Sequence, residues 1–342
     1  MRPLKDWIST LFAETPTPER VLFRVDAGRV EGLSYGHVSR CLALAKTARA
    51  VWGSRSLFLM RDHPEGVDYV VQAGWEVKTI PALQPIWDED EPVLSTAESF
   101  QPDWLVIDLP YPDLKTAWLK PLRRAGKRVL FIDDARFTCP EVDVYLNSSL
   151  LAPNRTRVEP GRQTRRLLGP DYFIFDDSLL AEPLVKSNGL INVVITCGGS
   201  DPTGLTLKML QRLVRQDWNG VTFRVILGPG FGSNEQAARL TGKRAGGFEL
   251  IHSPPNLIPY LRGADLTVCT GGRTMSELLY LGQRFLPIST ADHESEAIEA
   301  LLTAGLIKTG LTRWQADDFI VYLLELINEI GMGGRASAAA QA

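Results

Sequence analysis

The sequence of 342 residues has few cysteines and no long hydrophobic run. No two of its four cysteines form a CxxC pair, and all lie in or beside apolar segments, which argues against a zinc ribbon or a disulfide framework. We therefore expect reduced thiols and a cytoplasmic protein. No apolar run approaches the roughly 18 residues of a membrane span. Residues 1–20 lack the apolar stretch and cleavage site of a signal peptide.

The sequence also lacks an excess of positive charge. Lys and Arg number 37 against 40 Asp and Glu, so the net charge is −3, and a bulk attraction to nucleic acid or to an anionic membrane is excluded. Histidine is scarce as well, with four in the chain. His293 and Glu294 lie in an acidic stretch, ADHESE, but no second cluster of ligands accompanies them, so we expect no metal and no cofactor. The predicted partner is a small molecule, and we expect a monomer.

Short apolar segments alternate with helical patterns in the first half of the chain. Strands are predicted at 21–26, 56–60, 75–80, 104–109, 129–133 and 142–146, and helices at 37–50, 64–73 and 114–125. This βαβ succession predicts a mainly parallel sheet with right-handed crossovers.

A second βαβ series follows a proline- and glycine-containing linker, Glu182–Gly189. Its strands are predicted at 190–197, 222–227, 248–252, 266–269 and 285–288, and its helices at 205–214, 235–240, 257–262, 274–281, 297–304 and 314–330. The expected fold class is α/β, with two Rossmann-like domains facing across a cleft in which ligands bind. The expected boundaries are an N-terminal extension at 1–20, domains at 21–183 and 190–330, and a disordered tail at 331–342.

The loop 27–36 leads from the first strand to the first helix, and Gly36 and His37 stand at its end. Glycine permits a close approach of the backbone. The positive end of a helix dipole favours the neutral imidazole, which is a suitable general base. The alternative is that His37 only begins the helix and is satisfied by a nearby backbone group.

Two glycine turns stand at strand-to-helix junctions of the second half. In the first, Gly198, Gly199 and Ser200 precede a helix whose N–H groups would favour an anion such as a diphosphate. The alternative is a plain turn in which Asp201 or Thr203 caps the helix.

The second turn contains Gly271, Gly272, Arg273 and Thr274, and Glu277 lies one helical turn further on, where a carboxylate can accept hydrogen bonds from ribose hydroxyls. The alternative is a glycine turn followed by a solvated carboxylate. Neither turn is a Walker A motif, and the first strand is not followed by GxGxxG, which argues against a nicotinamide cofactor.

Acidic residues end three strands of the first half: Asp26, Asp108 and Asp133, the last followed by Asp134. Residues at the carboxyl ends of parallel strands face the ligand-binding side of such sheets. These carboxylates would hold sugar hydroxyls or orient His37; the alternative is that they form turns or cap helices.

Taken in order, these segments resemble the UDP-2,4-diacetamido-2,4,6-trideoxy-β-L-altropyranose hydrolase family of pseudaminic acid biosynthesis. Spore-coat polysaccharide proteins share the signature of this family. The resemblance covers roughly residues 20–305 and is carried by Arg24–Ala27, Gly36–Ala45, Val106–Asp108, Ile132–Asp134, Leu167–Tyr172, Gly198–Pro202 and Gly271–Thr274 with Glu277. The chain departs from the family at Leu109–Tyr111, where a His-Tyr pair is usual, and at His293–Glu294, where an Asn-Gln pair is usual.

The resemblance implies a glycosyltransferase-B-like (GT-B-like) fold and metal-independent hydrolysis of a nucleotide sugar at C1 with inversion. It implies that His37 is the base that activates water, that Glu277 holds the ribose, and that the two glycine turns bind the diphosphate. The expected substrate-binding residues are Asp26, Gly36, Asp108, Tyr111, Asp133, Gly198, Gly199, Ser200, Gly228, Gly271, Gly272, Arg273, Thr274, Glu277, His293 and Glu294.

Three functions remain open at this point. The first is hydrolysis of a UDP-linked amino sugar, with CDP as the other possible nucleotide. The second is a GT-B-type glycosyltransferase, which would share both glycine turns. The third is a non-catalytic homologue that binds a nucleotide sugar, because fold alone does not fix activity.

Overall fold

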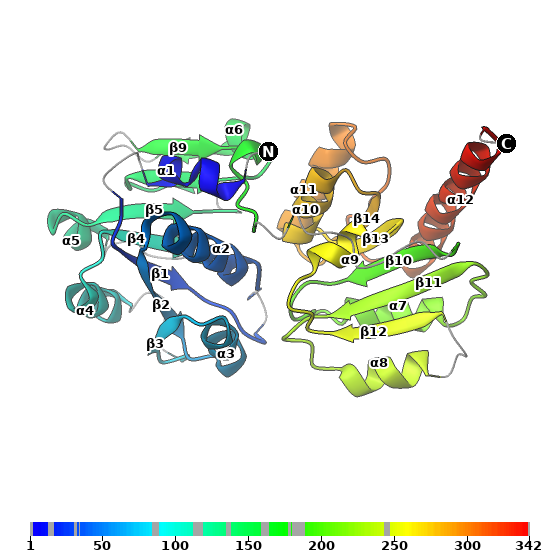
Figure 1. The fold of residues 1–342 in the computed structure, drawn as a ribbon, viewed down its shortest axis with the longest axis horizontal. Coiled ribbons are helices and arrows are strands. Elements are labelled where there is room, and N and C mark those ends of the chain that lie inside the picture. Colours follow the sequence, from blue (N-terminus) through cyan, green and yellow to red (C-terminus); the bar gives the residue numbers. More distant parts are fainter. Residues whose placement is uncertain are drawn as a thin grey trace. The chain divides into compact units, whose positions relative to one another are not determined.

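The structure is a computed structural model that describes residues 3–12, 17–30, 33, 35–83, 89–111, 119–134, 138–158, 164–176, 179, 189–242 and 247–340, the side chains of 333–340 excepted. The chain divides into two compact units, Met1–Asp177 and Ser178–Ala342 (Figure 1). The predicted linker lies, up to residue 188, outside the described residues, as does the first part of the helix predicted at 114–125.

The first unit is built on a seven-stranded parallel sheet. Its strands, in spatial order, are β3 (Glu76–Ile80), β2 (Arg55–Arg61), β1 (Arg20–Val25), β4 (Trp104–Asp108), β5 (Arg128–Ile132), β7 (Val144–Asn147) and β9 (Arg165–Leu168). The central strands are buried along almost their whole length, as expected for a parallel sheet covered on both faces. The order reverses between β1 and β4, which makes that junction the usual ligand position in this kind of sheet.

Helices connect these strands. They are α2 (Tyr35–Trp52), α3 (Pro64–Gln72), α4 (Asp90–Phe100), α5 (Leu119–Arg124) and α6 (Ala152–Arg155), with a 3₁₀ turn at Pro170–Tyr172 and a small second sheet of β6 (Thr138–Cys139) and β8 (Arg157–Val158). The sequence analysis predicted α2 and α3 but missed α4, whose buried Val93, Ala97 and Phe100 recur at helical spacing.

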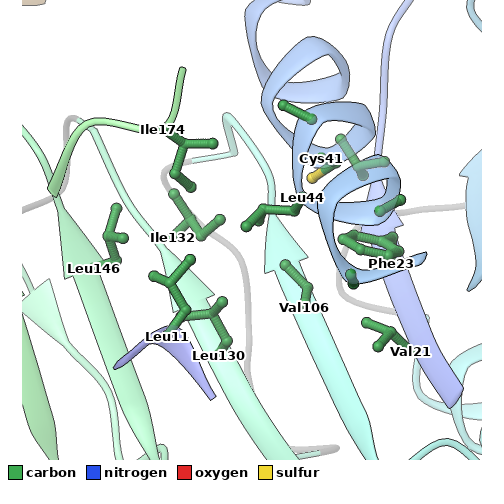
Figure 2. Close-up of a cluster of buried hydrophobic side chains, with 14 of the residues drawn as sticks. Leu11, Val21, Phe23, Cys41, Leu44, Val106, Leu130, Ile132, Leu146 and Ile174 are labelled. Carbon is green, nitrogen blue, oxygen red and sulfur yellow. The ribbon is translucent and has the colours of Figure 1, made fainter. Parts of the chain in front are cut away.

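The N-terminal residues belong to the core of the first unit. A 3₁₀ turn (Leu4–Asp6) and the short helix α1 (Ile8–Leu11) bury Leu4, Trp7, Ile8 and Leu11 in the same cluster as β1 and α2. Figure 2 shows Leu11 beside Leu130. The prediction of an extension outside both domains is therefore corrected: the apolar positions 4, 7, 8 and 11 have helical spacing and complete the core.

The second unit repeats the arrangement with five parallel strands. In spatial order they are β12 (Phe248–His252), β11 (Val221–Leu227), β10 (Ile191–Thr196), β13 (Leu266–Thr270) and β14 (Phe285–Ile288). The helices are α7 (Leu205–Leu213), α8 (Asn234–Thr241), α9 (Ile258–Arg262), α10 (Arg273–Leu281), α11 (Asp292–Thr303) and α12 (Ala316–Ala340). The first five strands of both units follow the Rossmann order 3-2-1-4-5.

The tail also differs from its prediction. The lack of core-forming periodicity after residue 330 predicts a disordered tail, whereas α12 continues to Ala340 (Figure 1). Alanine at 336 and 338–340 has the highest intrinsic helix propensity, which extends the helix past the glycines. Neither α12 nor any other helix in the described ranges combines the length and the hydropathy that crossing a membrane requires.

Candidate active site

His37 lies in the first turn of α2, which packs over β1 and β4. Its Nδ1 is 2.7 Å from Oδ1 of Asp108, the fully buried last residue of β4. The strand order reverses at this junction, so the carboxyl end of β4 meets the start of α2 there. The structure thus brings the predicted base into contact with one of the predicted strand-end carboxylates.

Arg40 follows His37 by one helical turn and faces the same carboxylate. Its Nε and Nη2 donate to the two carboxylate oxygens of Asp108, and its Nη1 donates to Oδ1 of Asp134 at 2.7 Å. The thiol of Cys41 is 3.7 Å from Asp108. We call His37, Arg40, Asp108 and Asp134 the His37 cluster.

The electrostatics of this cluster determine which ring nitrogen of His37 carries the proton. Burial alone would raise the pKa of Asp108, but the charge of Arg40 and the hydrogen bonds from Arg40 and His37 outweigh burial and lower it below its ordinary value, so Asp108 is ionised. Arg40 Nη2 lies 3.1 Å from Nδ1, whereas Asp108 Oδ1 is nearer and only accepts. Nδ1–H therefore donates to Asp108, and the lone pair of the neutral ring is on Nε2. The side chain is 13% exposed.

A second ionic cluster stands at the carboxyl ends of β1 and β2. Arg24 donates to both carboxylate oxygens of Asp26 and of Glu89, and Arg61 donates to Glu89 through its side chain and to Asp26 through its backbone N–H. Tyr111 Oη donates to Asp26 at 2.7 Å. We call Arg24, Asp26, Arg61 and Glu89 the Arg24 cluster. Despite its burial, Asp26 has a lowered pKa, because Arg24 and its hydrogen-bond donors stabilise the carboxylate.

This second cluster changes the roles that Asp26 and Tyr111 can have. The Asp26 carboxylate is fully buried, and its two oxygens accept hydrogen bonds from Arg24, Arg61 and Tyr111. Asp133 likewise accepts a hydrogen bond from Tyr145 at 2.7 Å, whereas its neighbour Asp134 joins the His37 cluster.

In the second unit, an aspartate that follows the first glycine turn caps the start of α7. Gly198 has φ +76°, a conformation that favours glycine. The Asp201 carboxylate accepts hydrogen bonds from the N–H groups of Leu205 and Thr206 at the start of α7. The expectation that this helix start offers those groups to an anion is corrected: the capping alternative is what the structure contains.

Gly228 packs closely against the backbone of Gly198 and Gly199, the residues that precede Ser200 in the first glycine turn. A Cβ at Gly228 would collide with the carbonyl oxygens of Gly198 and Gly199, and Gly230 N–H donates to the Gly199 carbonyl at 2.7 Å. Only glycine allows this close approach at position 228.

The second glycine turn leads directly into α10. Gly272 is the N-cap of this helix and, as a glycine, contributes no capping side chain of its own. The Gly271 backbone lies against Glu294, where an added Cβ would come within 2.7 Å of the Glu294 Cβ. Glu277 accepts a hydrogen bond from Arg273 at 2.9 Å, and Thr274 lies between them on the first turn.

The two remaining predicted residues begin α11. Glu294 accepts hydrogen bonds from the N–H and hydroxyl of Thr290, so its carboxylate ties the start of α11 to the loop after β14, while His293 beside it is exposed. Gly36 directly precedes His37 within α2.

Sequence reasoning missed the arginines. Arg24 and Arg40 organise the two clusters of the first unit, with Arg61 and Glu89 completing one of them. A signal was present: Arg24 interrupts the apolar strand VLFRVD, and Arg40 follows His37 at a spacing of three on a helix. Across the parts of the chain that the structure describes, no group of three or more His, Cys, Asp or Glu side chains is arranged to hold a metal ion.

Solved structures with the same architecture define the fold class as GT-B, two Rossmann-like units in one chain. The glycotransferase of kitacinnamycin has a TM-score of 0.62 at 13% identity, with 95% of each chain covered. The spinosyn rhamnosyltransferase SpnG complexed with thymidine diphosphate has a TM-score of 0.56 at 16% identity, covering 92% of this chain and 96% of that one. UDP-GlcNAc 2-epimerase from Neisseria meningitidis bound to UDP-GlcNAc has a TM-score of 0.57 at 13% identity, covering 90% of this chain and 91% of that one.

Two curated proteins are similar in sequence. The spore coat polysaccharide biosynthesis protein SpsG of Bacillus subtilis is 22% identical over 306 residues, 88% of this chain and 87% of that protein. An uncharacterized protein of Methanocaldococcus jannaschii is 25% identical over 267 residues, 75% of this chain. The matched region spans about half, 52%, of that archaeal protein. No protein-family model matches the chain.

Proposed function

We propose that the protein hydrolyses a UDP-linked amino sugar at C1 and releases UDP and the free sugar, in the biosynthesis of a pseudaminic- or sialic-acid-like surface sugar. The N-terminal domain (21–183) would hold the sugar and the base, and the C-terminal domain (190–330) the nucleotide. The similarity to a spore coat polysaccharide biosynthesis protein supports a role in glycan synthesis.

The observation that carries the proposal is the contact between His37 and Asp108. With the proton of the neutral ring on Nδ1, Nε2 accepts a proton from a water molecule as the water oxygen forms a bond to C1. The bond from C1 to the diphosphate oxygen breaks, and its electron pair leaves with UDP. Asp108 stabilises the imidazolium that forms, as the carboxylate of a catalytic triad does.

The second glycine turn supports binding of the departing diphosphate. α10 begins directly after this glycine turn, and the N-terminal end of a helix dipole favours negative charge. Fixed N–H dipoles stabilise charge that develops in the transition state. Two of the structural neighbours are described with thymidine diphosphate or UDP-GlcNAc bound, which agrees with a nucleotide-diphosphate ligand.

The test is incubation with a panel of UDP- and CDP-linked amino sugars, followed by mass spectrometry. We expect release of UDP and free sugar, and a fall in kcat of about 10²–10⁴-fold in His37→Ala, the range typical of a general base. His252→Ala, which removes an exposed histidine at the end of β12, is the matched control and should retain full turnover. Equal turnover by wild type and His37→Ala would contradict the proposal.

A glycosyltransferase is the second candidate, favoured by the glycosyltransferases among the structural neighbours. The same base would then deprotonate an acceptor hydroxyl in place of water. The partition of products decides between the two: transfer to an added sugar acceptor that exceeds hydrolysis would favour the transferase.

A further inference from the structure

Arg40 joins two carboxylates of which only one touches His37. Its Nε and Nη2 hold Asp108, and its Nη1 holds Asp134 at the end of β5. The Arg40 side chain is 9% exposed and that of Asp108 is fully buried, whereas the side chain of Asp134 is 41% exposed. Asp134 is therefore the one member of the His37 cluster in substantial contact with solvent.

The charges of the cluster do not cancel while the imidazole is neutral. The guanidinium of Arg40 balances one carboxylate, and the second carboxylate leaves one negative charge in excess. When His37 takes up a proton, the cluster becomes neutral. Arg40 opposes that uptake because it is a cation beside the ring, and Asp134 offsets Arg40.

We propose that Arg40 and Asp134 form an outer ion pair that sets the proton affinity of the His37–Asp108 pair, with Asp134 as a positioning residue that acts through Arg40. The proposal deepens the proposed function and rests on it, because it concerns the residue named there as the base. Without Asp134, Arg40 would leave the pair with no excess negative charge and His37 would be a weaker base.

Among the residues that the structure describes, the charged groups that face His37 come from three elements. They are Arg40 from α2 itself, Asp108 from β4 and Asp134 after β5, and both carboxylates interact electrostatically with the ring. Partial desolvation of Asp134 acts to raise its pKa, but the charge and hydrogen bond of Arg40 outweigh it and lower the pKa below its ordinary value. Asp134 is thus charged across the range in which a histidine titrates. The Cys41 thiol donates a weak hydrogen bond to Asp108 at 3.7 Å.

The test titrates His37 in the ligand-free full chain by NMR, in wild type and Asp134→Asn. The chain has four histidines, and a His37→Gln spectrum assigns the signal. We expect the midpoint of the His37 titration to fall by about 0.5 pH unit, about threefold in proton affinity, because one nearby negative charge is lost. Asp134→Glu, which keeps the carboxylate, should restore the midpoint. Asp68→Asn removes an exposed carboxylate from α3 and should leave it unchanged.

A kinetic measurement separates this inference from the proposed function. In Asp134→Asn the acid limb of kcat/KM against pH should move to lower pH by the same amount as the NMR midpoint, and the plateau of kcat should fall because the base is weaker. An unchanged NMR midpoint in folded Asp134→Asn would overturn the outer ion pair whatever the activity. A shifted midpoint with no hydrolysis of any nucleotide sugar would support the ion pair and contradict the proposed function.

Discussion

Two arginine–carboxylate clusters lie at the carboxyl ends of the strands of the first unit, and they differ in exposure to solvent and in net charge. In the Arg24 cluster two arginines face two carboxylates, and the side chains are between 0% and 9% exposed. In the His37 cluster one arginine faces two carboxylates, and exposure reaches 13% at His37 and 41% at Asp134. The first is closed and neutral, and the second is open and one negative charge in excess.

This difference suits the Arg24 cluster to a structural role and the His37 cluster to proton transfer. A closed, neutral network has no group that needs to change protonation, so its contribution is to fix the ends of β1 and β2 and the segment that precedes α4. An open network with an imidazole in it can take up a proton and become neutral. Residue type alone does not distinguish the two, because aspartate and arginine occur in both.

The largest effect on stability is expected from opening the closed cluster. Arg24→Met leaves Asp26 and Glu89 buried without their main partner, and removal of one member of a buried ion pair costs about 3–5 kcal/mol. Hydrogen exchange of the β1 amides measures this as a loss in the free energy of opening of the first unit.

Arg55→Met is the matched control for that experiment. Its ion pair with Glu76 is exposed, at 65% and 56%, and pairs of this kind contribute about 0–1 kcal/mol. Similar losses in Arg24→Met and Arg55→Met would show that the closed cluster is no more important to the fold than a surface pair.

Breaking the open cluster at Asp108 should lower catalysis in the folded protein, besides the stability lost because Asp108 is the buried partner of Arg40. In Asp108→Asn the amide can donate to Nδ1 and move the imidazole proton to Nε2, the wrong tautomer for a base, so kcat should fall about 10²–10⁴-fold. Steady-state kinetics with the best UDP-sugar substrate measures the change.

Asp143→Asn is the corresponding control, since Asp143 accepts a backbone hydrogen bond from Val129 in the same sheet and does not contact His37. It should keep kcat within about twofold of wild type. If Asp108→Asn also kept its kcat, the His37 cluster would be structural, like the Arg24 cluster.

The fold was largely predictable because alternation of buried strands and amphipathic helices is a local property of the sequence. The strands Trp104–Asp108 and Ile191–Thr196 begin and end within a residue of the predicted positions. The N-terminal helix and α4 were not predicted because such short helices are stabilised mainly by packing against the core, which a local apolar pattern does not reveal.

The candidate site was predictable in part. His37 and Asp108 were both singled out, but their contact depends on the strand order at the β1–β4 junction, which no local pattern reveals. Asp26 and Asp108 look alike in sequence, each ending an apolar strand. They differ in their arginine partner. Arg24 on β1 pairs with Asp26 two residues further along the chain, whereas Arg40 reaches Asp108 from the helix α2.

Tyr111 gives the finest test of the comparison, because sequence reasoning placed it at the sugar and the structure places its hydroxyl on Asp26. Tyr111→Phe keeps the ring, which lies 5.3 Å from the Arg61 guanidinium, and removes one hydrogen bond to a carboxylate, at a cost of about 1.5 kcal/mol. Tyr145→Phe removes the same kind of hydrogen bond from Asp133 and is the matched control. If Tyr111 belongs to the closed cluster, hydrogen exchange should show a similar loss of stability in both variants, and KM should change less than about twofold because no substrate contact is lost. A tenfold rise in KM in Tyr111→Phe alone, with stability unchanged, would instead show that its hydroxyl contacts the substrate and that Tyr111 does not belong to the Arg24 cluster.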